Sequence, residues 1–197
     1  MPKVTEEHRV AKHDEIIESA LRAFARKGFQ ATSMAEIIAE SGMSAGAIYG
    51  YFDSKAEIVR SAAASIVAAR MNDLDQLSRL DPMPQPSEMV GTIIRGLVVQ
   101  GAWPALLLQV WGEAVTDPSM REVANEFFSR VRSAFADYIA RWHRQTHGLS
   151  ESEALRVAEE QAPLFLSVVH GFVVQDSLIA EFDRSSYLAK TLPYLPR

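Results

Sequence analysis

The chain has 197 residues, of which 48% are hydrophobic and 23% charged, an ordinary composition for a globular protein with a core of its own. It has no cysteine, which excludes disulfides, thiolate metal sites and a cysteine nucleophile. The formal net charge is −5, and residues 1–60 hold eight Lys and Arg against nine Asp and Glu. The net charge therefore does not attract nucleic acid, and a few Lys and Arg side chains at suitable positions would have to make the contacts with it.

The apolar stretches of the chain are short. The N-terminal residues contain no apolar run of the kind that makes a signal peptide. The most apolar stretches, 97–111 and 164–174, are shorter than the roughly 20 residues that cross a bilayer. We therefore expect a soluble, cytoplasmic protein with no membrane partner.

The first 60 residues have the pattern of short, capped helices. Apolar residues recur every three or four positions from Lys12 to Lys27, which predicts an amphipathic helix. The sequence SMAE at residues 33–36 is a capping box and opens a short helix that Gly42 ends. Ser44 can cap a second short helix, which we expect from Ala45 to about Phe52.

The rest of the chain is also helical in pattern. A capping box at residues 54–57 opens a long helix toward Leu80, and three prolines within 81–88 break the chain. Five more helices are expected after this break: 88–100, one that carries Leu107 to Ala114 after Gly101 and Pro104, 117–148, 150–179 and 186–195. No stretch alternates as a strand does. The prediction is an all-α fold of about nine helices.

Residues 42–46 read GMSAG and leave three interpretations open. They fit G-x-S-x-G, the pattern that holds a nucleophilic serine at a strand-to-helix turn of α/β-hydrolases, but the letters before Ser44 are typical of a helix. They also fit a helix-turn-helix whose second helix, with alanine or glycine at 45, 46, 47 and 50, can lie deep in a major groove. In the third interpretation these residues only pack a helical corner.

The run from Phe24 to Ile58 resembles the DNA-binding domain of TetR-family transcriptional regulators. The resemblance is carried by these residues: Gly28-Phe29, Thr32-Ser33, Ile37-Ile38-Ala39, Gly42, Met43-Ser44-x-Gly46, Ile48-Tyr49-x-Tyr51-Phe52 and Ser54-Lys55. It implies a three-helix DNA-binding head over residues 1–55 and a larger ligand-binding and dimerisation body over residues 56–197. It also implies a regulator without enzymatic activity, cofactor or metal.

The resemblance implies a set of DNA-contacting residues: Thr32, Ser33, Ser44, Ala45, Gly46, Ala47, Tyr49, Tyr51 and Lys55. Thr32 and Ser33 would touch phosphate, and Tyr51 and Lys55 would hold the DNA backbone. The groove-facing positions carry no Arg, Lys, Asn or Gln, so the usual bidentate base contacts are missing. Specificity would then rest on alanine–thymine methyl contacts, on DNA shape and on an N-terminal arm with Lys3, Arg9 and Lys12.

As a function, the resemblance implies a ligand-responsive repressor that binds a near-palindromic, double-stranded operator as a homodimer. A small apolar or aromatic effector would release it. The dimer would form through helices at about 151–180 and 185–196. The apolar run 164–174 fits such a surface, but it equally fits a buried core helix. An activator that binds DNA without a small ligand is the alternative function.

Candidate effector-binding residues lie on the apolar faces of the later helices: Met89, Ile93, Trp103, Leu107, Trp111, Phe127, Val131 and His170. Each of them also fits a plain core position. The polar side chains of Gln109, Glu113 and His170 are candidates for orienting an effector. The histidines are too scattered in the sequence to predict a metal site.

Overall fold

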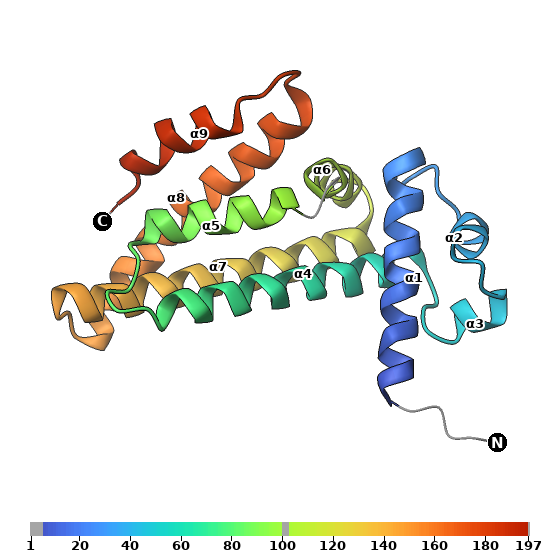
Figure 1. Ribbon diagram of the computed structural model, residues 1–197, viewed down its shortest axis with the longest axis horizontal. Coiled ribbons are helices and arrows are strands. Elements are labelled where there is room, and N and C mark those ends of the chain that lie inside the picture. The colour runs from blue at the N-terminus through green and yellow to red at the C-terminus, as the bar shows by residue number, and fades with distance from the viewer. Residues whose placement is uncertain (1–5, 100–102, 197) are drawn as a thin grey trace. The chain divides into compact units, whose positions relative to one another are not determined.

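The computed structural model describes residues 6–99 and 103–196 (Figure 1). Within these ranges the chain is all-α, with nine α-helices, a final 3₁₀ turn and no strand, as predicted. The helices are α1 Glu6–Lys27, α2 Met34–Ser41, α3 Ala45–Tyr49, α4 Lys55–Ser78, α5 Pro86–Val99, α6 Trp103–Ala114, α7 Pro118–His147, α8 Glu151–Leu178 and α9 Arg184–Thr191, followed by the turn Leu192–Tyr194. No described helix combines the length and the hydropathy of a membrane span.

The chain divides into two compact units. The first comprises residues 1–65 and 109–124, and the second comprises residues 66–108 and 125–197. The division falls inside α4, and it places the second half of α6 and the start of α7 with α1, α2 and α3. Each unit is described below by itself.

The first unit is built around α1, with α2 and α3 on one side of it (Figure 1). Helix α1 begins at Glu6, six residues before the predicted start, because the polar first turns continue the helix without adding to the apolar stripe. The core of the unit is made of fully or almost fully buried side chains: Ile16, Ala20, Phe24, Phe29, Ile37, Ile48, Phe52 and Ile58. Except for Phe29, which lies in the turn after α1, these are apolar positions from which the sequence predicts helices.

Two predicted helix boundaries are wrong for local reasons. Helix α3 ends at Tyr49 and not near Phe52, because the N–H groups of Tyr51 and Phe52 both bond to the Ile48 carbonyl, each at 3.0 Å, and tighten the chain into a turn. Pro104 lies inside the first turn of α6 and does not separate helices, since the first N–H groups of a helix have no acceptor within it. Gly101 falls outside the described residues.

Side-chain caps form fully at the starts of α2, α3, α7 and α8 and only in part at α4. Capping boxes open α2 at Ser33 and α8 at Ser150, and Asp117 Oδ1 accepts from the N–H groups of Ser119 at 2.7 Å and Met120 at 3.2 Å at the start of α7. At α4 only half of the capping box forms. The Ser54 hydroxyl accepts from the Glu57 N–H, but the Glu57 carboxylate accepts from the N–H of Asp53 at 2.6 Å, one residue before the expected donor.

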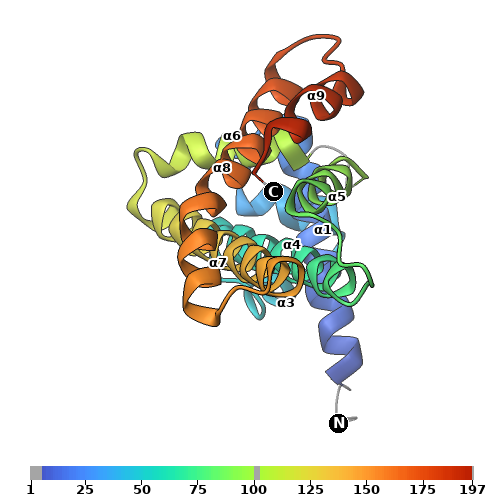
Figure 2. The same ribbon diagram turned by 90° about the vertical axis from the view of Figure 1, so that its left-hand side faces the viewer.

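The second unit packs long helices side by side. The parts of α4 and α7 that belong to this unit run alongside each other, and α5 packs on α8 (Figures 1 and 2). Helix α9 returns against α8, where the Tyr187 hydroxyl donates to the Val168 carbonyl at 2.8 Å. The α8–α9 connection is held by Arg184, whose guanidinium donates to both carboxylate oxygens of Asp176 at 2.5 and 3.1 Å.

Candidate nucleic-acid interface

The start of α2 is fixed by reciprocal hydrogen bonds. The Ser33 N–H donates to Glu36 Oε2 at 2.7 Å, and the Glu36 N–H donates to Ser33 Oγ at 3.3 Å. Lys27, at the end of α1, also pairs with the Glu36 carboxylate. The bond from Lys27, followed by the bonds from Ser33, lowers the pKa of Glu36 from 4.5 to about 2.

This lowered pKa predicts an acid dependence of stability. A carboxyl whose pKa is depressed by folding stabilises the protein above its unfolded pKa, and that contribution is lost as the pH falls through the folded value. The stability difference between wild type and Glu36→Gln should therefore be full above about pH 4.5 and shrink from there toward about pH 2. Urea unfolding at stepped pH measures it. Glu122→Gln, at an exposed position of α7, is the control, and a difference that does not depend on pH would contradict the assigned cause.

The turn between α2 and α3 explains the GMSAG letters. Gly42 ends α2 with φ 67°, a left-handed conformation that favours glycine. Ser44 has extended backbone, and its hydroxyl accepts from the Ala47 N–H at 3.2 Å, so it is the N-cap of α3. Residues 34–41, directly before the turn, form a helix, whereas a nucleophile elbow needs a strand there. The hydrolase interpretation of Ser44 is therefore wrong.

The outer side of α3 consists of small residues and one tyrosine. Ile48 is fully buried and fixes the inner side of the helix. Ser44, Ala45, Gly46 and Ala47 are exposed, and Tyr49 is 50% exposed. The outer side therefore has a low profile, which an α-helix needs if its backbone is to come close to the floor of a groove.

Gly46 is not required by the fold. A Cβ built on Gly46 meets no atom within 4 Å, and its φ lies outside the left-handed region. Glycine in a helix is less favourable than alanine by up to about 1 kcal/mol. Neither backbone geometry nor internal packing requires this glycine, and its missing side chain keeps the outer side of α3 low enough for an external partner to approach closely.

The two residues expected to touch phosphate at the start of α2 differ in exposure. Ser33 is exposed, as such a contact needs. Thr32 is only 1% exposed, and its hydroxyl donates to the Gly28 carbonyl at 2.8 Å. The expectation for the Thr32 side chain is therefore corrected: it ties the α1–α2 loop to the end of α1.

Lys55, at the first position of α4, is bound to the protein itself. Its Nζ donates to the carbonyls of Phe29 at 3.0 Å and Gln30 at 3.3 Å and lies 4.7 Å from the centre of the Phe29 ring. An ammonium group has three donors, so one remains for a phosphate. Tyr51, the other expected backbone contact, is half-buried.

Replacement of Lys55 should therefore affect both folding and binding. In Lys55→Ala we expect a loss of about 1–2 kcal/mol of unfolding free energy, since two carbonyls lose a charged donor. If the third donor binds a phosphate, affinity should fall for all DNA sequences, and the salt slope should decrease by about 0.9. Urea unfolding and anisotropy titrations at stepped salt measure the two effects. Lys55→Arg, which keeps the charge, is the control, and an unchanged slope in Lys55→Ala would contradict the phosphate contact.

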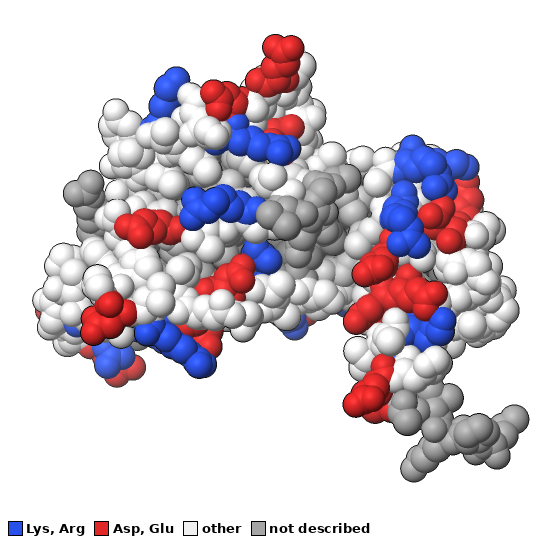
Figure 3. Space-filling model, in the orientation of Figure 1, with Lys and Arg blue, Asp and Glu red and all other residues white. Residues whose placement is uncertain are grey.

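Most other cations near α1 and α2 are also paired. Arg22 and Arg26 donate to the Glu40 carboxylate at 3.3 and 2.8 Å, and acidic and basic side chains mix on this part of the surface (Figure 3). Arg9 and Lys12, expected in an N-terminal arm, are helical residues of α1 with ion pairs to carboxylates one turn away. Lys3 lies outside the described residues. A phosphate would have to compete with these internal partners.

Gln109, in the middle of α6, makes a contact that sequence reasoning missed. It was expected to orient an effector, but its Oε1 accepts from the Phe29 N–H at 2.7 Å. Since Lys55 binds the Phe29 carbonyl, the peptide groups on both sides of Phe29 are held. No local pattern around Gln109 predicts this bond, because its two ends are 80 positions apart.

The expected effector-binding residues do not all lie together. Met89, Ile93 and Leu107 are buried in the second unit, and Phe127, Val131 and His170 are half-buried there. Burial lowers the pKa of His170, whose ring stacks edge-on against Phe128 with centroids 4.9 Å apart. Trp111 belongs to the first unit. The side chain of Trp103 lies outside the described residues.

Comparison with known proteins places the helix-turn-helix in a family. The model of the bacterial regulatory proteins of the tetR family matches residues 16–62, which run from α1 into α4. The uncharacterised regulator YfiR of Bacillus subtilis is 48% identical over 59 residues, 30% of this chain and 29% of YfiR. Residues 16–62 therefore belong to the tetR family of bacterial regulatory proteins.

Similarity to known regulators extends beyond residues 16–62. The HTH-type transcriptional regulator TtgR of Pseudomonas putida is 31% identical over 123 residues, 62% of this chain and 52% of TtgR. The chain thus spans about half or less of these curated relatives. A putative TetR-family regulator from Syntrophomonas wolfei has the same fold, with a TM-score of 0.77 at 13% identity over 94% of this chain and 93% of that one.

Proposed function

We propose that this chain is a ligand-responsive repressor that binds a near-palindromic DNA operator as a homodimer. The observation that carries the proposal is the low, exposed side of α3, with a glycine that the fold does not require. In this proposal α3 lies in the major groove, and two copies read half-sites about one helical turn apart, roughly 34 Å. Because the operator is chromosomal DNA, the protein acts in the cytoplasm.

Operator recognition rests on small groups. The methyl groups of Ala45 and Ala47 meet thymine methyls, and the Ser44 hydroxyl can bond either base type. Without a bidentate side chain on α3, discrimination at each base pair is weak, and DNA shape supplies part of the specificity. Ser33, Tyr49, Tyr51 and the remaining donor of Lys55 hold the phosphates.

The dimer forms through α8 and α9 in this proposal. In the apolar run 164–174, Phe165, Val169 and Phe172 are buried in their own subunit, whereas Leu164 is 53% exposed. Further along α8, Leu178 is 69% exposed. The run therefore has an inner and an outer side, and the exposed leucines support a contact with a second copy. Light scattering of a Leu164→Glu variant, expected to shift toward monomer, tests this surface.

The effector is a small apolar or aromatic molecule that binds in the second unit. The half-buried side chains of Phe127 and Val131, together with the neutral His170 favoured by its lowered pKa, suit such a molecule. Effector and operator would oppose each other by one coupling energy, typically about 1–3 kcal/mol. A fall in operator affinity on adding the effector supports repression with release, and an effector-independent affinity supports the activator alternative.

A genomic selection tests the function. Purified full-length protein is mixed with fragmented DNA of its host at low salt, and the retained fragments are sequenced. The proposal predicts enrichment of intergenic fragments that share an inverted repeat. Enrichment of fragments with no common motif would indicate that the chain binds DNA without an operator and would contradict the proposal.

A further inference from the structure

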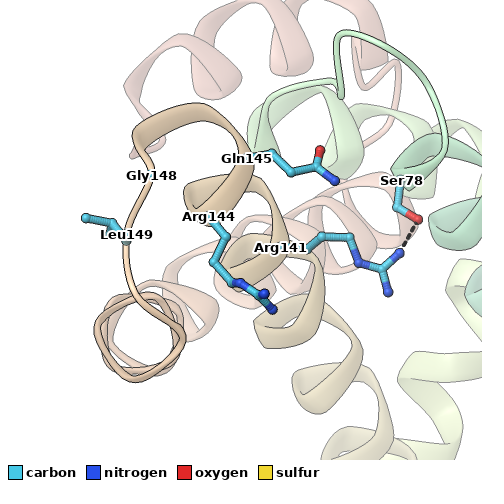
Figure 4. Close-up of a pocket in the computed structure, with 6 residues that line it drawn as sticks. All are labelled: Ser78, Arg141, Arg144, Gln145, Gly148 and Leu149. Carbon is cyan, nitrogen blue, oxygen red and sulfur yellow. Dashed lines mark hydrogen bonds between the residues drawn. The ribbon is translucent and has the colours of Figure 1, made fainter.

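A polar hollow lies in the second unit, beside the last turns of α7 and the end of α4 (Figure 4). Its volume is about 600 Å³, within the range of small-molecule sites. The residues that line it are Ser78, Arg141, Arg144, Gln145, Gly148 and Leu149. Such sites are mostly apolar, whereas this one has two guanidinium groups and an amide, so its chemistry is that of a site for a charged group.

The lining residues are held by the fold. Arg141 Nη1 donates to Ser78 Oγ at 2.6 Å, and the Ser78 hydroxyl donates to the Asp75 carbonyl at 2.8 Å. One side of the Arg141 guanidinium is thereby fixed while its other N–H donors stay available. Arg141 and Gln145 extend from α7 toward Ser78, and Leu149 points away from it (Figure 4). Arg144 lies three positions after Arg141, so the two neighbour each other on the helix surface.

The two arginines have no carboxylate partner among the described residues. Five other arginines of the same unit do pair with carboxylates: Arg70, Arg79, Arg130, Arg156 and Arg184. The C-terminal ends of α4 and α7 could by themselves explain why cations lie here, since a helix C-terminus carries about −0.5 charge. Two such ends offset only about half of the +2 charge on Arg141 and Arg144, so about one positive charge is left over.

Gly148 keeps the hollow open. It follows the end of α7 with φ 65°, and a Cβ built on it meets no atom within 4 Å. Its left-handed backbone turns the chain sharply toward α8. The α7–α8 connection therefore bounds the hollow without placing a side chain at this corner.

We propose that this hollow binds a phosphate group, either free or carried by a small molecule. The two guanidinium groups supply planar pairs of N–H donors that match phosphate oxygens, and the Gln145 amide adds a neutral donor. The site uses none of the residues assigned to DNA or to the apolar effector. It therefore stands whether or not the proposed function is correct.

Calorimetric titration of the full-length protein tests the site. Inorganic phosphate and glycerol 3-phosphate are titrated in separate arms, with ionic strength held constant by sodium chloride. The variant is Arg144→Gln, because the Arg144 side chain is exposed and makes no hydrogen bond or ion pair with the described residues. Arg132→Gln removes the same charge from an exposed position of the same helix and is the control.

We expect wild type and Arg132→Gln to bind phosphate alike and Arg144→Gln to bind it about tenfold more weakly or worse, since a charged hydrogen-bond donor is lost. Tighter binding of glycerol 3-phosphate assigns the hollow to a phosphorylated small molecule, and equal binding assigns it to free phosphate. No binding by wild type, or equal binding by wild type and Arg144→Gln, would overturn the proposal.

Discussion

Replacing Gly46 by leucine should abolish operator binding and leave the fold intact. The added side chain would project from the outer side of α3, where a Cβ meets no protein atom within 4 Å. It would instead collide with the groove floor and hold the helix away from the base edges. We expect affinity for the operator to fall toward the non-specific level, a loss on the order of 10³-fold. Fluorescence anisotropy with an operator selected by the wild type measures the loss.

The alanine variant separates folding from binding more finely. Gly46→Ala should leave stability unchanged or raise it by up to about 1 kcal/mol, because alanine is the better helix former. It should nevertheless weaken operator binding. Gly112 in α6 is a matched control, since a Cβ there also meets nothing within 4 Å. Gly112→Ala should show the same stability effect with no change in DNA affinity, and a Gly46→Ala protein that binds as well as wild type would contradict the role of Gly46.

Gln109→Leu should loosen the loop between α1 and α2. The change preserves most of the side-chain volume but removes the acceptor of the Phe29 N–H, a backbone group at a residue only 5% exposed. An unsatisfied buried donor costs about 1–3 kcal/mol, and we expect a loss of stability of that size. Urea unfolding measures it, and faster hydrogen exchange of the Phe29 amide would locate the effect.

The control for this variant is its neighbour. Gln30→Ala truncates an exposed side chain in the same loop and should change stability by less than about 0.5 kcal/mol.

Because α6 begins in the second unit and ends in the first, we also expect Gln109→Leu to weaken the response of DNA binding to an effector. If Gln109→Leu had wild-type stability and unchanged hydrogen exchange at Phe29, the hydrogen bond between Phe29 and Gln109 would not stabilise the loop.

The sequence predicts the helices and caps of this protein well, because these features depend on residues a few positions apart. Ser33 with Glu36 and Ser150 with Glu153 form capping boxes that can be read directly, and Ser44 is the cap that its position before Ala45 indicates. The exposed, low side of α3 follows from the same local pattern, since one buried residue, Ile48, fixes which side faces inward.

The contacts that local patterns miss join residues far apart in the chain. The bonds from Phe29 to Gln109 and from Lys55 to Phe29 and Gln30 depend on how helices meet, and no spacing rule contains them. Thr32 illustrates the same limit. A threonine before a capping serine fits a phosphate contact, but its burial is decided by the packing of the α1–α2 loop.

The central claim is that α3 lies in the major groove, and cleavage of DNA from α3 tests it most directly. The chain has no cysteine, so Ala45→Cys creates a single site for an iron chelate that cleaves nearby DNA. On the selected operator the account predicts two clusters of cuts in major-groove segments about 10 base pairs apart, and no discrete clusters on unrelated DNA. Cuts that are absent or equally dispersed on both DNAs, from protein that still binds the operator, would contradict it.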